Sequence, residues 1–251
     1  MSKGDKSMLY KEYLKKIHSI LEKVEETQGE SIETAAGMIA NSIKKGGILH
    51  VFGCGHSQMY AMEVFYRAGG LVPVNAILTP MLSLEPKAPL STQGERMEGL
   101  AKTILDNEVV GENDVIFIAS TSARNSVPVE MAIEARKKGM KVIILISREF
   151  ADSVTSRHKT GKKAHDFADV ILDNCGVSGD GIMEIKGVEA KFGPTSSVIG
   201  FAILQAVIVQ AVENLAVENM EVPIWVSANL DKGDNTNKKY IEQYKGRISC
   251  L

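Results

Sequence analysis

The chain has 251 residues, of which 44% are hydrophobic and 24% are charged, and this composition excludes intrinsically disordered and fibrous proteins. The formal net charge of -2 at pH 7 argues against binding nucleic acid or an anionic membrane through overall charge, so we expect neither partner. Three cysteines without metal-ligand spacing predict no disulfide framework and no metal site. Residues 1–10 lack the apolar core of a signal peptide, and we expect a cytoplasmic protein.

Two amphipathic helices are predicted at the N-terminus. Apolar residues recur at helical spacing over residues 8–26, and again from Ser31 to a stop at Gly46-Gly47. A unit of strand, helix and strand follows, predicted at 48–52, 57–68 and 72–77. Units of this kind build parallel sheets.

The central part of the chain predicts a second such unit after a long loop. Residues 79–95 hold three of the seven prolines and have no clear period, which favours a loop. The helices and strands predicted beyond it are a helix at 94–106, a strand at 114–119, a helix at 128–138 and strands at 141–146 and 170–172. The basic residues His158, Lys159, Lys162 and Lys163 indicate a solvated surface stretch.

The C-terminal part contains a long helix that is apolar on nearly all sides. It is predicted to run from Thr195 to about Asn219, after an ambiguous stretch in which 182–188 favours a hairpin arm. A helix of this kind is buried in its own fold or against another subunit, so we expect a homodimer or homotetramer. We divide the chain into a helical lead-in (1–44), an α/β domain (45–222) and a tail (223–251) with a short helix at 236–244.

The turn Gly53-Cys54-Gly55-His56-Ser57 connects a strand to a helix and is suited to binding an anion. Glycines let the backbone approach a ligand closely, and the N–H groups at a helix start favour negative charge. A dinucleotide site is disfavoured, because position 58 is Gln where a third glycine is needed and no acidic residue closes the strand near Ile77. We therefore expect a phosphate site and no cofactor.

Two further turns rich in Ser and Thr strengthen this interpretation. Ser120 to Ser126 follows a strand, and Thr195 to Ser197 begins the apolar helix. Ligands of open parallel sheets bind outside the carboxyl ends of the strands, where such turns meet. Arg124 lies within the second turn, and its guanidinium group matches a phosphate in geometry.

The three turns together resemble those of the sugar isomerase (SIS) domain, over roughly residues 31–215. The likeness is greatest to a group of bacterial SIS-domain proteins often labelled phosphoheptose isomerases. The resemblance implies a three-layer α/β/α fold with a doubly wound parallel sheet of five strands, and a small-molecule sugar phosphate as ligand. The candidate ligand-binding residues are Gly55, Ser57, Ser120, Thr121, Ser122, Arg124, Asn125, Thr195, Ser196 and Ser197.

The sequence departs from this family at several positions. Ala123 stands where the second turn usually has Gly, and Asn125 where it usually has Ser or Thr. Phosphoheptose isomerases carry a catalytic Glu ten residues after the phosphate-binding Ser, and here that position is Arg67. Their His on the last long helix is also missing, since residues 195–218 contain none.

Two residues are candidates for moving a proton in an aldose–ketose isomerisation. Glu63 lies on a mostly apolar helix, where a carboxylate either acts as the base or pairs with Arg67 one turn later. His56, within the first turn, is the alternative acid or base, or else a loop histidine bonded to the backbone. Alternative functions are a phosphosugar sensor without catalysis and an amino-sugar-phosphate lyase.

Overall fold

A parallel sheet of five strands forms the centre of the protein. The computed structural model describes residues 8–218, 220–231 and 233–251. The strands lie in the order β2-β1-β3-β4-β5, which confirms the predicted doubly wound α/β fold. Their bounds are Leu49–Gly53 for β1, Val74–Ala76 for β2, Val115–Ala119 for β3, Lys141–Ile146 for β4 and Val170–Asp173 for β5.

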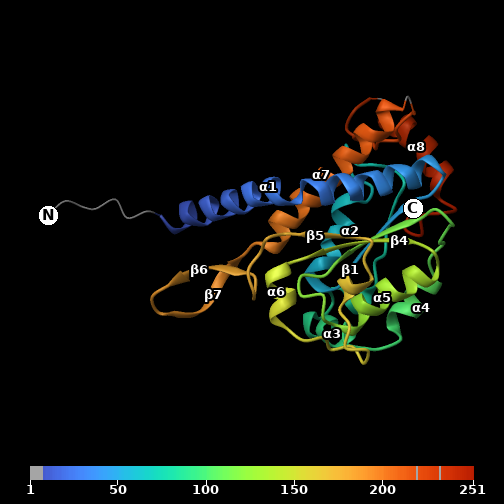
Figure 1. Ribbon diagram of the computed structural model, residues 1–251. Helices are drawn as coiled ribbons and strands as arrows, with labels where there is room; N and C mark the ends of the chain where they lie inside the picture. The colour runs from blue at the N-terminus through green and yellow to red at the C-terminus, as the bar shows by residue number, and fades with distance from the viewer. Residues whose placement is uncertain (1–7, 219, 232) are drawn as a thin grey trace.

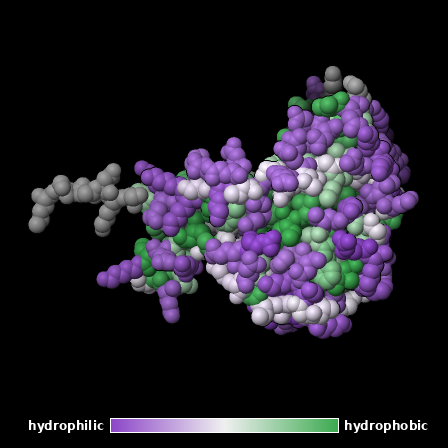
Figure 2. All heavy atoms as spheres, in the orientation of Figure 1, coloured by the Kyte–Doolittle hydropathy of each residue, from purple (hydrophilic) through white to green (hydrophobic). Residues whose placement is uncertain are grey.

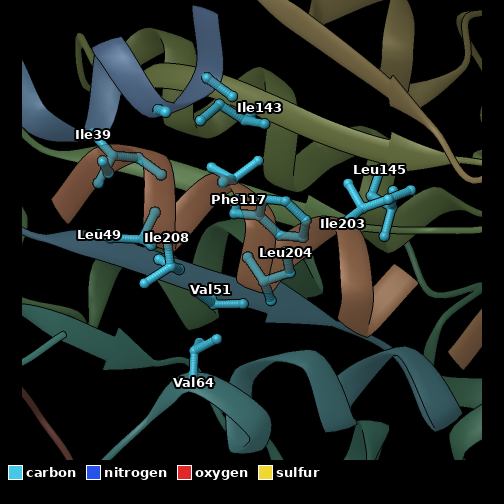
Figure 3. Close-up of a cluster of buried hydrophobic side chains, with 14 of the residues drawn as sticks. Ile39, Leu49, Val51, Val64, Phe117, Ile143, Leu145, Ile203, Leu204 and Ile208 are labelled. Carbon is cyan, nitrogen blue, oxygen red and sulfur yellow. The ribbon is translucent and has the colours of Figure 1, made fainter. Parts of the chain in front are cut away.

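Helices cover both faces of this sheet (Figure 1). Alternate residues of each strand point to opposite faces, so Val51 packs with α1 and α7 while Phe52 packs with α4 and α5. Figure 3 shows the first of these layers, where Ile39 and Ile203 meet the sheet residue Phe117. The helices are α1 (Leu9–Lys44), α2 (Met59–Val64) and α7 (Ser196–Val217) on one face, and α4 (Leu100–Asp106) and α5 (Ser126–Lys137) on the other.

Helix α1 is a single helix of 36 residues, so the expectation of two separate helices was wrong. The polar stretch around Gly29 continues the helix, with the hydroxyls of Thr27 and Thr34 donating to carbonyl groups four residues earlier at 2.7 Å each. The buried residues Val24 and Ala35 lie on either side of this stretch. Because α1 is buried before and after this stretch, the helix continues through a segment whose own sequence favours a break.

Three other local predictions also need correction. Residues 79–95 contain a 3₁₀ turn (Pro80–Leu82) and helix α3 (Ala88–Gly94), and α4 starts at Leu100 rather than at Gly94. Helix α6 (Arg148–Ser153) and a second 3₁₀ turn (Ala164–Phe167) were not predicted. His158 belongs to no solvated face, since its side chain is 3% exposed and its Nε2 lies 3.5 Å from Glu130 Oε1.

Helix α2 is shorter than the predicted helix 57–68, because the chain becomes extended at Phe65 and left-handed at Tyr66. The segment that follows pairs with the C-terminal tail, where the Trp225 N–H donates to Gly70 O at 2.9 Å. Trp225 and Tyr240 are buried against each other edge to face, with ring centroids 6.1 Å apart. The tail, which includes α8 (Gly233–Tyr244), thus packs on its own domain.

The N-terminal part of α1 and an antiparallel hairpin project together from the body (Figure 1). The hairpin consists of β6 (Gly181–Ile185) and β7 (Val188–Pro194). The Tyr13 hydroxyl donates to Pro194 O at 2.8 Å, and Lys16 Nζ donates to Ile182 O at 2.8 Å. These contacts join the hairpin to α1, and we call the projection formed by 9–28 and 181–194 the arm.

Among the described residues one helix, α7, has the length and apolar composition to cross a membrane. The same properties are found in core helices of water-soluble folds. Here Ile203, Leu204 and Val207 of α7 are at most 1% exposed and pack against α1 and the sheet.

A buried polar cluster lies at the amino ends of the strands and holds the C-terminus. His50 Nε2 lies 2.9 Å from Asp114 Oδ2, and both side chains are fully buried. Arg247 Nη2 donates to both Asp114 oxygens, at 2.8 and 2.9 Å. Burial alone would raise the pKa of Asp114, but hydrogen bonds from His50 and from backbone N–H groups keep this pKa below its ordinary value. The cluster therefore favours an ionised carboxylate to which the tail is bound.

We expect Arg247→Ala to lower the free energy of unfolding by about 2–3 kcal/mol, because it leaves the buried Asp114 without its guanidinium partner. Lys245→Ala is the matched control, since its pair with Glu242 is exposed and contributes about 0–1 kcal/mol. Urea unfolding of both variants measures the difference. Equal losses would show that Arg247 does not stabilise the buried carboxylate.

Candidate functional site

The first two predicted turns start side by side at the point where the strand order reverses. After β1 the chain runs to β2 on one side, and it later returns to β3 on the other. Gly53, the last residue of β1, is paired with Ala119, the last residue of β3. The two turns that leave these residues therefore share the crevice in which doubly wound folds bind ligands.

The first turn is tightly wound around its glycines. A side chain at Gly53 would come within 2.1 Å of Ser57 O, and Gly55 has a positive φ of 59°. Residues Gly55–Gln58 form a 3₁₀ turn, in which the Ser57 N–H donates to Cys54 O at 3.0 Å. The turn leaves His56 exposed and Ser57 half-buried, so both can meet a ligand.

The second turn contains a left-handed residue that is not a glycine. Ala123 adopts a φ of 53° in the left-handed region and is fully buried. Its N–H donates to Ser120 O at 3.0 Å, and its carbonyl accepts from the Ala164 N–H at 2.9 Å. Two hydrogen bonds thus hold Ala123 in this conformation, and Ser120, Thr121 and Ser122 are half-buried along the turn.

Arg124 and Asn125 connect the second turn to the loop after α6. The Arg157 N–H donates to Arg124 O at 2.8 Å, and Arg157 Nη1 donates to Asn125 Oδ1 at 2.9 Å. Asn125 is the N-cap residue of α5, but its side chain makes no capping hydrogen bond. Nε of Arg124 is buried and has no hydrogen-bond partner among the described residues. Arg157 is thus a residue of the site that the sequence analysis missed.

Helix α3 and the residue after it close over both turns. Ser91 Oγ would be 3.4 Å from a side chain at Gly55, and Glu95 O accepts from the Val127 N–H of α5 at 3.0 Å. Burial raises the pKa of the half-buried Glu95, against the opposing effects of Asn125, Arg96 and Arg157. Burial and the charge of Glu95 raise the pKa of the Cys54 thiol well above its ordinary value, which favours a packing role for Cys54. The sequence analysis did not find Glu95 or Arg96.

The third predicted turn is already occupied by a carboxylate of the protein. Asp180 Oδ1 accepts from the N–H groups of Thr195 and Ser196 at 2.9 and 2.8 Å. The two hydroxyls donate to the same carboxylate, at 3.1 Å from Thr195 and 2.7 Å from Ser196. Thr195 is fully buried and Ser197 half-buried. This turn therefore differs from the first two, because Asp180 neutralises the start of α7.

Glu63 lies on α2 facing α7, and its pairing with Arg67 is confirmed. Glu63 Oε1 accepts from Arg67 Nη1 and, at 3.1 Å, from Gln205 Nε2. The arrangement stabilises a carboxylate that is 27% exposed. A catalytic role for Glu63 stays a prediction.

An open cleft of about 650 Å³ begins beside the first turn. Gln58, next to Ser57, lies at its edge and donates to Thr79 O at 3.3 Å. Apolar side chains of Met62, Leu78 and Pro86 line much of it. Among the described residues, no group of three or more His, Cys, Asp or Glu side chains is placed to hold a metal ion.

The chain belongs to the SIS domain family, whose family model matches residues 12–147. Within that family it is similar along nearly its whole length to UPF0309 proteins. It is 41% identical over 240 residues to one from Geobacillus thermodenitrificans, covering 96% of each chain. It is 44% identical over 235 residues to one from Halalkalibacterium halodurans, covering 94% of this chain and 97% of the other.

A solved phosphoheptose isomerase from Francisella tularensis has the same fold, with a TM-score of 0.51. The likeness covers 84% of this chain and 98% of that one, at 17% sequence identity.

We expect Asp180→Ala to lower the free energy of unfolding by about 2 kcal/mol, the upper end of the range for an N-cap, because four hydrogen bonds to the start of α7 are lost. Asp180→Asn retains one side-chain acceptor and should lose less. Chemical denaturation tests this order, with Asp152→Ala on the exposed side of α6 as the control. An Asp180→Ala variant as stable as the control would contradict the capping role.

Proposed function

We propose that the protein binds a phosphorylated sugar across the carboxyl ends of β1 and β3. The observation that supports this best is the meeting of two turns at the switch point, with Gly53 paired to Ala119. Their backbone N–H groups, the hydroxyls of Ser57, Ser120 and Ser122, and the guanidinium group of Arg124 are suited to a phosphate. Membership of the SIS domain family favours the same ligand class.

We further propose an aldose–ketose isomerisation, the reaction type of the phosphoheptose isomerase whose fold this chain shares. The reaction needs one group to move a proton between adjacent carbons of the open-chain sugar. His56 is exposed within the first turn, whereas Glu63 would first have to leave Arg67 and Gln205. Unchanged turnover in both His56→Ala and Glu63→Gln would eliminate this assignment.

A sensor without catalysis is the second candidate, and the pairing of Glu63 supports it. Glu63 is held by a guanidinium and an amide group, and it would have to leave both partners before it could take a proton from a sugar. An amino-sugar-phosphate lyase would need two carboxylates at the site, of which Glu95 offers one.

The domain division and the cytoplasmic location also stay predictions.

A panel of sugar phosphates in a thermal-shift assay tests the binding function. A ligand at a hundred times its dissociation constant should add about 2.7 kcal/mol of stability. We expect Ser120→Ala to weaken the shift and Ser153→Ala, on α6, to leave it unchanged. NMR of each bound sugar then separates an isomerase from a sensor. If no sugar phosphate raised the melting temperature, the binding function would be refuted.

We also propose that the protein forms a homodimer or homotetramer, and that the arm takes part. Apolar side chains lie among hydrophilic ones on this projection (Figure 2). Leu14 is 58% exposed and Val188 is 52% exposed, which is unfavourable in an isolated chain.

We expect Val188→Lys to lower the molar mass measured by light scattering, because it places a charge in the proposed contact between subunits. Glu189→Lys is the matched control, since neighbouring residues of a strand point to opposite faces. Equal masses for both variants and for the unchanged protein would exclude the hairpin from the interface.

A further inference from the structure

Three guanidinium groups and one carboxyl group gather beside the second turn. Arg124 belongs to this turn, Arg157 is bonded to its neighbour Asn125, and Arg96 follows Glu95 at the end of α3. Burial, followed by the charges of Arg124 and Arg96, lowers the pKa of the Arg157 guanidinium group. Three positive charges so close together repel one another, and the carboxylate of Glu95 offsets only one of them.

The cluster is positively charged in either state of Glu95, as a site for a phosphate monoester needs to be. Three guanidinium groups leave two positive charges when Glu95 is ionised and three when it is neutral. A phosphate monoester carries about -1.5 to -2 at neutral pH. The charge of this cluster therefore suits one phosphate group.

A buried donor without an acceptor points to the same place. Nε of Arg124 has no partner among the described residues, and such a group costs free energy unless a ligand or water satisfies it. The N-cap side chain of α5 is also turned to Arg157 rather than to the N–H groups of its helix. An anion at this position could accept from both the guanidinium group and the start of α5.

We propose that Arg96, Arg124 and Arg157 form the subsite for the phosphate dianion, and that Glu95 is its built-in counter-ion, which takes up a proton when the anion binds. The proposal deepens the phosphosugar-binding function and rests on it. In the free protein Glu95 balances part of the arginine charge. A bound dianion balances the arginine charge instead and repels the carboxylate, so Glu95 takes up a proton and becomes neutral.

The direction of the pH dependence follows from the proton that Glu95 takes up on binding. Since binding takes up a proton at Glu95, affinity for a dianion should rise as pH falls through the raised pKa of Glu95. The groups that face Glu95 are Cys54 from the first turn, Arg96 from its own segment, Asn125 from the second turn and Arg157 from the loop after α6. Burial raises the pKa of the Cys54 thiol and so favours its neutral form, which leaves Glu95 as the group that takes up the proton in this proposal.

Sulfate is the probe, because it stays a dianion throughout pH 5–8 while phosphate does not. Isothermal titration calorimetry on the full chain should show sulfate binding more tightly at pH 5 than at pH 8. Glu95→Gln should bind sulfate equally well at both values, as tightly as the unchanged protein at pH 5.

Arg96→Gln and Arg157→Gln should each weaken sulfate binding by about tenfold, as expected for the loss of a charge-assisted hydrogen bond. Arg136→Gln is the matched control, since Arg136 lies at the other end of α5 and pairs with Asp169. Melting temperatures establish that the variants are folded.

Each result decides a separate part of the proposal. If Arg96→Gln and Arg157→Gln bound sulfate as tightly as Arg136→Gln, the arginine subsite would be wrong. If Glu95→Gln kept the full pH dependence, its role as counter-ion would be wrong. Absence of sulfate binding in the unchanged protein would overturn the subsite altogether. The separate sugar-phosphate panel would then show whether phosphosugar binding at the turns still stands.

Discussion

The parallel pairing of β1 with β3 is the constraint on which the candidate site depends. These strands are separated by the excursion to β2 and by helices α3 and α4, yet their last residues, Gly53 and Ala119, are register partners. Both turns must then leave the sheet at the same height and enter helices on opposite faces. The crevice between them is a consequence of the strand order, and the Ser, Gly and Arg residues give it its chemistry.

The same two strands are fixed at their amino ends by a different kind of interaction. His50 of β1 and Asp114, just before β3, form a buried pair to which Arg247 of the tail is bonded. Such a pair is costly to bury, and it stabilises the fold only when all its hydrogen bonds are made. Arg247 of the tail supplies two hydrogen bonds to Asp114. Its position at the end of the sheet opposite to the turns leaves the crevice open to a ligand.

The strands and the first two turns could be predicted from the sequence, because an uninterrupted apolar run ending in Gly or Ser has few other structural interpretations. The continuity of α1 through Gly29 could not be predicted, since it depends on burial on either side of a polar stretch. Glu95 and Arg157 were missed for a related reason. Each stands in a segment without periodicity, and only the packing of α3 and of the loop after α6 brings them to Asn125.

The two long helices that start near the crevice differ in how well their starts are suited to an anion. Every helix start favours negative charge, so α5 and α7 offer similar sites at first sight. Asp180 already satisfies the start of α7, and its charge also contributes to the raised pKa of the buried Tyr60. At α5 the cap residue Asn125 is neutral and turned to Arg157, and Nε of Arg124 has no hydrogen-bond partner in the described part of the chain. A second dianion beside Asp180 would meet repulsion, whereas one beside Arg124 would meet unbalanced positive charge. These charges therefore favour an anion at the α5 end of the crevice, in line with the proposed subsite.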